Sequence, residues 1–162
     1  MDNYTNRITL ICKPEQSGKT FVMIQQIIND LRDLSLTHEV INIILCDNNL
    51  LLTKQTSERV GKDLSEEVEI NGVPYLEFSS HSRTEYRNVD AVVGAIIRKG
   101  IHNILCCTNG TRVADIYDII CDLNKSQFTK GKLFFKIWLD EADKFTGFID
   151  DTFRPLVKKY EN

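Results

Sequence analysis

The chain has 162 residues, of which 42% are apolar and 9% aromatic, and this composition fits one globular domain with one buried core. The 20 basic and 23 acidic residues give a formal net charge of -3, without a block of like charges that would indicate a nucleic-acid arm. The five cysteines lack a Cys-x-x-Cys spacing, which argues against a disulfide framework or a zinc site. The apolar stretch 8–12 is too short for a signal peptide or a membrane span. We therefore expect an intracellular protein, cytoplasmic or nuclear.

Short apolar runs alternate with longer segments of helical period along the chain. The runs predict strands at residues 8–12, 40–46, 73–79, 102–108 and 133–140. Between them, apolar residues recur at spacings of three and four, which predicts amphipathic helices. These residues are Phe21, Ile24, Ile28 and Leu31, then Val89, Val92, Val93, Ile96 and Ile97, and finally Val113, Ile116, Ile120 and Leu123. The order predicts an α/β fold in which helices cover both faces of a mostly parallel sheet, joined by right-handed crossovers.

Residues 13–20, KPEQSGKT, stand between the first expected strand and the first expected helix. A phosphate-binding loop requires that context, because backbone amides at a helix N-terminus attract phosphate. Lys19 is expected to reach the terminal phosphates of ATP, and the Thr20 hydroxyl to bind Mg²⁺. Lys13 stands where the usual pattern has glycine, and a chance SGKT at a helix start is the alternative. The candidate phosphate ligands are Gln16, Ser17, Gly18, Lys19 and Thr20.

The apolar run 133–140 leads into the acidic pair Asp140 and Glu141. Ligands of open α/β sheets bind at the carboxyl ends of the strands, so we expect these carboxylates beside the phosphate loop. Asp140 is the candidate Mg²⁺ ligand, and Glu141 is the candidate base that polarises an attacking water. Capping of a following helix is the alternative role for these acids. The two motifs in this order, each after an expected strand, favour a nucleotide site.

Residues 140–143 spell DEAD, and together with KPEQSGKT they make the chain resemble the first RecA-like domain of DEAD-box-like superfamily 2 helicases. The phosphate loop of that family commonly reads A-x-x-G-x-G-K-T, which this chain matches at Gly18, Lys19 and Thr20. The resemblance implies a P-loop NTPase fold, a three-layer sandwich, in a single domain over residues 1–162. It also implies Mg²⁺ and ATP as cofactors.

Residues 108–112, TNGTR, resemble the family's motif Ib, whose loop contacts the sugar-phosphate backbone of a single strand of DNA or RNA. By that resemblance, Thr108, Asn109 and Arg112 are the candidate nucleic-acid contacts, since they offer hydroxyl, amide and guanidinium donors to phosphate. The alternative is an ordinary turn in which Asn109 or Thr111 caps a helix.

The sequence contains no counterpart of the family's second RecA-like domain or of its arginine residues. We therefore expect Mg²⁺-dependent ATP binding, with hydrolysis that requires a second RecA-like domain or a partner protein. Two other functions stay open at this point. One is a degenerate, non-catalytic module that binds a protein partner through its sheet edge. The other is a small P-loop nucleoside kinase.

Overall fold

The computed structural model describes residues 18–33, 39–46, 54–63, 75–78, 86–139 and 151. The helices are α1 (Lys19–Arg32), a helical segment at 54–63, α3 (Val89–Lys99) and α4 (Gly110–Lys125). The strands are β1 (Glu39–Cys46), β2 (Tyr75–Phe78), β3 (Asn103–Cys107) and β4 (Leu133–Leu139). The predicted alternation of helices and strands is confirmed over this part of the chain. The strand predicted at 8–12 lies outside the described residues.

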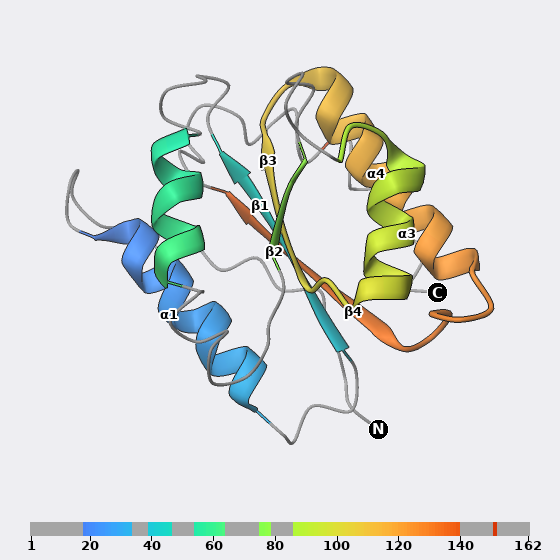
Figure 1. Ribbon diagram of the computed structural model, residues 1–162, viewed down its shortest axis with the longest axis horizontal. Helices are drawn as coiled ribbons and strands as arrows, with labels where there is room; N and C mark the ends of the chain where they lie inside the picture. Colours follow the sequence, from blue (N-terminus) through green and yellow to red (C-terminus); the bar gives the residue numbers. More distant parts are fainter. Residues whose placement is uncertain are drawn as a thin grey trace.

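The strands form one parallel sheet in the order β2-β3-β1-β4 (Figure 1). β1 pairs with β3 on one side and with β4 on the other, so Cys46 lies opposite Cys107 and Leu45 lies opposite Leu139. All residues of β1 after Glu39 are buried. A strand that is covered on both faces needs no polar alternation, and this explains the continuous apolar run in the sequence. The predicted α/β fold with a parallel sheet is confirmed.

Helices cover both faces of the sheet (Figure 1): α1 and the segment 54–63 lie on one face, and α3 and α4 lie on the other. In the crossover from β1 to β2, the described helical segment 54–63 lies on the first face, and in the crossover from β3 to β4, α4 lies on the second. The two crossovers run in opposite directions along the sheet, so they must use opposite faces to have the same hand. The core on the first face consists of Met23, Ile24, Ile27, Ile28, Ile44, Cys46, Val60 and Leu105.

The buried face of α1 differs from the predicted one at its first residue. The apolar spacing places Phe21 in the core-facing stripe, but its side chain is 55% exposed. The buried residues of this helix are Met23, Ile24, Ile27 and Ile28, which are two adjacent pairs one turn apart. The helix face that these four residues share does not include Phe21, and the aromatic ring in the first turn of α1 is therefore exposed. In the part of the chain that the structure describes, no helix has the length and apolar character to cross a membrane.

Candidate functional site

The candidate phosphate loop leads into α1, and the structure describes it from Gly18 onward. Gly18 is the N-cap of α1 and has a left-handed backbone, with φ 80° and ψ 30°. Its carbonyl oxygen accepts a hydrogen bond from the backbone N–H of Val22 at 3.0 Å. A residue with a Cβ atom is disfavoured in that conformation by about 1–2 kcal/mol, which explains the glycine directly before Lys19. Gln16 and Ser17 lie outside the described residues.

The N-terminus of α1 has the chemistry of an anion site. Gly18 has no side chain with which to cap the helix, and the first turn contains no acidic residue. The amides of a first helical turn lack intrahelical partners, and the helix dipole adds positive partial charge there. Lys19 and Thr20 belong to this turn, and both are partly exposed. A phosphate group would therefore fit this turn, and Lys19 and Thr20 remain the predicted further ligands.

The sheet determines where this end of α1 lies. The helix runs antiparallel to β1 and β4, so it begins at the edge where those strands end (Figure 1). An ion pair between Asp30, near the C-terminus of α1, and Lys136, in the middle of β4, holds the other end of the helix against the sheet. Ligands of parallel α/β sheets bind at the carboxyl edge. β4 ends at Leu139, and the predicted residues Asp140 and Glu141 lie outside the described residues.

The turn between β3 and α4 lies at the same edge of the sheet, and hydrogen bonds from its own side chains stabilise it. Thr108 is 3% exposed. Its backbone N–H donates to the carbonyl oxygen of Cys46 at 2.8 Å, and its hydroxyl donates to the same oxygen. The Asn109 Oδ1 atom accepts a hydrogen bond from the backbone N–H of Arg112 at 2.9 Å. This confirms Asn109 as a helix cap, one of the two interpretations open from the sequence. Nucleic-acid contact by this turn stays a prediction.

Arg112 makes several contacts within the protein and is only 7% exposed. Its Nη1 atom donates to the backbone oxygen of Arg87 at 3.0 Å and pairs with Oδ2 of Asp115 at 2.9 Å. The guanidinium carbon lies over the Phe78 ring, 4.5 Å from the ring centroid. Arg112 thus links the end of β2, the segment before α3 and the first turns of α4. The structure brings Thr108, Asn109 and Arg112 together in one turn, and the predicted role of Arg112 at nucleic acid stays a prediction.

Two neighbouring thiols end β3. The Asn109 Nδ2 atom donates to Sγ of Cys107 at 3.2 Å, and Cys107 is partly exposed, whereas Cys106 is buried. The adjacent thiol of Cys106 lowers the pKa of Cys107 to about 7. Hydrogen bonding with Cys107 and then burial raise the pKa of Cys106 well above its ordinary value. At neutral pH, Cys107 is therefore partly a thiolate, and Cys106 keeps its proton.

A buried polar row on the α1 face of the sheet was not predicted. Asn42 and Asn103 are both 0% exposed. The Asn42 Nδ2 atom donates to Oδ1 of Asn103 at 3.2 Å, and Nε1 of Trp138 donates to Oδ1 of Asn42 at 2.9 Å. A register slip would bury these amides without partners, so the row fixes the pairing of three strands. The sequence signal is one asparagine inside each of the apolar runs 40–46 and 102–108.

Comparisons of the chain with protein-family models, with curated proteins and with solved structures find no match. The site itself must therefore support any functional assignment.

Proposed function

We propose that the chain is the ATP-binding, first RecA-like domain of a helicase-like, nucleic-acid-dependent ATPase. The observation that carries this proposal is the geometry at Gly18. A glycine with a left-handed backbone directly precedes Lys19 and Thr20 in the first turn of α1. That turn has no side-chain cap and lies at the carboxyl edge of a parallel sheet. Each feature is what a phosphate-binding loop of this kind requires.

The proposed roles follow from the chemistry of each residue. Bound Mg-ATP supplies the phosphoryl group whose transfer to water is the reaction of this class. The first-turn amides and Lys19 hold phosphate oxygens, while Thr20 and Asp140 hold the metal. Glu141 orients and polarises the attacking water. β4, which leads to these two acids, is parallel to β1 and ends at the same edge at which α1 begins.

The nucleic-acid partner and the second domain are also parts of the proposal. The turn of Thr108, Asn109 and Arg112 lies at the same edge of the sheet as the proposed ATP site. A single strand bound there would lie along the loops at the carboxyl ends of the strands, with contacts to its sugar-phosphate backbone. A second RecA-like domain or a partner protein would supply the arginine that stabilises the charge of the transition state.

The test is a titration of the purified chain with a fluorescent ATP analogue, with and without Mg²⁺. We expect saturable, Mg²⁺-sensitive binding. Lys19→Ala should weaken it roughly 10- to 100-fold, the effect of losing one charge-assisted contact of about 1.5–3 kcal/mol. Lys125→Ala is the matched control, because this exposed residue at the C-terminus of α4 also carries one positive charge. Circular dichroism of both variants checks the fold.

Equal, weak binding by the native chain and Lys19→Ala would overturn the proposal and favour a non-catalytic module. Hydrolysis supplies a second test of the same proposal. We expect very slow turnover by this chain alone, because in this proposal a second domain or partner protein supplies the arginine contribution of about 10³ to 10⁵ in rate. Turnover of about 1 per second or more, as in complete enzymes, would contradict the requirement for a second domain.

A further inference from the structure

The ring of Phe21 is exposed at the beginning of α1, beside the proposed phosphate site. Among the described residues, the large apolar side chains that are exposed are Phe21, at 55%, and Phe128, at 61%. A single exposed apolar residue is ordinary on a protein surface, so the surroundings of each ring decide whether it has a function. Phe128 lies in the turn before β4, at the opposite edge of the sheet. Phe21 directly follows Thr20 in the first turn of α1.

The geometry of the helix directs the Phe21 ring toward the N-terminal end of α1. In an α-helix each Cα–Cβ bond leans toward the N-terminus, and a long side chain covers the turn that precedes its own Cα atom. A Cβ atom on Gly18 would lie 3.9 Å from the Cβ atom of Phe21. The side chain of Phe21 therefore begins next to the N-cap residue, at the end of the helix where the first-turn N–H groups lie.

The Phe21 ring is not used for packing among the described residues. It belongs to neither hydrophobic core, and it makes no ring or cation contact with another described residue. Helix propensity does not account for it either, because alanine or lysine favours a helix more than phenylalanine does. The ring thus has a surface available to another molecule.

Lys19 and Phe21 lie on different sides of the first turn. They are two residues apart, which separates their side chains by about 200° around the helix axis. A phosphate held by Lys19 and the first-turn amides would therefore lie between the ammonium group and the aromatic ring. A ligand that carries a planar group beyond its phosphates can contact both residues. A nucleoside triphosphate has this form, because its sugar joins a planar base to the phosphates.

We propose that Phe21 stacks on the base of the bound nucleotide and makes the site select a nucleoside triphosphate over other polyphosphates. Such a stack needs only the π-face that every base has. The inference rests on the proposed function, because Lys19 and the first-turn amides must hold the phosphates. It adds a binding residue that lies outside the motif KPEQSGKT.

The test compares Mg-ATP with Mg-tripolyphosphate by isothermal titration calorimetry. Tripolyphosphate has the three phosphates of ATP but no base or sugar. We expect the native chain to bind ATP more tightly. Phe21→Ala should weaken ATP binding about tenfold, as the loss of one base–aromatic stack does, and leave tripolyphosphate binding unchanged. Phe128→Ala is the matched control, because it removes the other exposed ring, and it should bind both ligands as the native chain does.

A second variant, Phe21→Trp, reports the contact itself. The larger ring can still stack, so the affinity for ATP should be retained. The fluorescence of the new indole should be quenched by ATP but not by tripolyphosphate. The native chain has one tryptophan, Trp138, which is partly buried in β4, and a parallel titration of the native chain corrects for its signal.

Unchanged ATP binding by Phe21→Ala, equal losses for the two ligands, or no quenching in Phe21→Trp would overturn the inference. The proposed phosphate site would stand in each case, provided that Lys19→Ala weakened the binding of both ligands. If instead Lys19→Ala bound both ligands as the native chain does, or the native chain bound neither, the proposed function would fail and the role of Phe21 with it. The two failures can therefore be distinguished.

Discussion

Helices α1 and α4 both begin at the carboxyl edge of the sheet, but their N-termini differ. At α4, Asn109 caps the first turn, Thr108 donates to the end of β1, and Arg112 is held by three partners. At α1, Gly18 provides no cap, and no acid occupies the first turn. Buried or terminal backbone groups need partners. The protein supplies its own side-chain partners at α4, whereas the described residues at the start of α1 include no side-chain cap, and the proposed function assigns its donors to a bound phosphate.

The largest expected effect is on the free energy of unfolding of an Arg112→Ala variant. The substitution removes a hydrogen bond, an ion pair and a ring contact from a side chain that is 7% exposed. It leaves the Arg87 carbonyl and the Asp115 carboxylate without this partner. We expect a loss of about 3 kcal/mol, measured by urea denaturation followed by circular dichroism.

Arg112→Lys tests which part of the side chain matters in that comparison. A lysine keeps the charge near Asp115 but lacks the planar fork that lies over Phe78 and reaches the Arg87 oxygen. The free energy of unfolding of Arg112→Lys should therefore lie between those of the native chain and of Arg112→Ala. If Arg112→Ala itself cost less than about 0.5 kcal/mol, as an ordinary surface substitution does, the arginine would not hold the α4 end together.

A smaller loss is expected when the cap of α4 is removed. Asn109→Ala should reduce the free energy of unfolding by about 1 kcal/mol, the usual value for a side-chain cap. Asn88→Ala is the matched variant, because Asn88 caps α3 through the same contact, its Oδ1 accepting from the backbone N–H of Ala91 at 2.9 Å. Similar losses in both would show that Asn109 acts as a cap. An unchanged free energy of unfolding in Asn109→Ala would mean that the side chain of Asn109 contributes no stabilising cap to α4.

Most of the fold could be predicted from the sequence because the deciding signals are local. The run 40–46 is apolar on both faces of its strand. The glycine at position 18 depends on a single local feature, the positive φ angle of that residue. The cap at Asn109 likewise involves only the four consecutive residues 109–112, because its Oδ1 atom accepts from the backbone N–H of Arg112.

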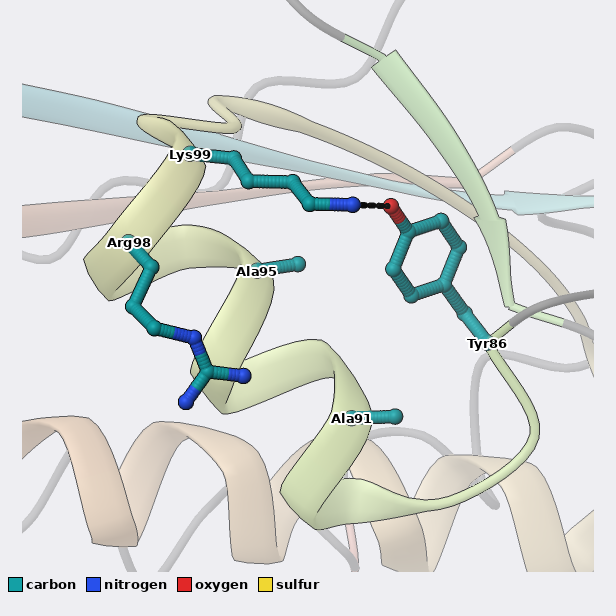
Figure 2. A pocket seen from close by; sticks show the side chains of 5 residues that line it. All are labelled: Tyr86, Ala91, Ala95, Arg98 and Lys99. Carbon is teal, nitrogen blue, oxygen red and sulfur yellow. Dashed lines mark hydrogen bonds between the residues drawn. The ribbon is translucent and has the colours of Figure 1, made fainter.

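The contacts of the candidate site needed the structure, because they join segments that are distant in the sequence. From the sequence, Arg112 is expected to be a free cation. In the structure it contacts Phe78 and Arg87, which come close to it because β2 pairs with β3. Phe21 obeys the helical spacing, but the sheet contacts a face of α1 centred on other residues. Lys99 donates a hydrogen bond to the Tyr86 hydroxyl across the length of α3 (Figure 2), and no apolar pattern in the sequence reveals this contact.

The smallest expected effect concerns the reactivity of Cys107 beside the α4 cap. Its pKa of about 7, which the Cys106 thiol lowers, means that the thiolate fraction grows as pH rises through 7 and is nearly complete by pH of about 8.5, where an ordinary thiol is half ionised. The rate of reaction with iodoacetamide, followed by mass spectrometry, should therefore rise to a plateau with a midpoint near 7. Cys106, buried and protonated, should stay unmodified.

Substitutions at Cys106 distinguish the cause of this low pKa from simple exposure. Cys106→Ala removes the hydrogen-bonding partner, so the midpoint for Cys107 should move upward, toward that of an ordinary thiol. Cys106→Ser keeps a donor of similar size, so the midpoint should stay close to 7. If both variants retained the low midpoint, the neighbouring thiol would not be its cause, and the N-terminus of α4 would have to stabilise the thiolate through its backbone donors. In that case the N-terminus of α4 would stabilise negative charge, as we propose for α1, and the difference between the two helix ends would be one of degree.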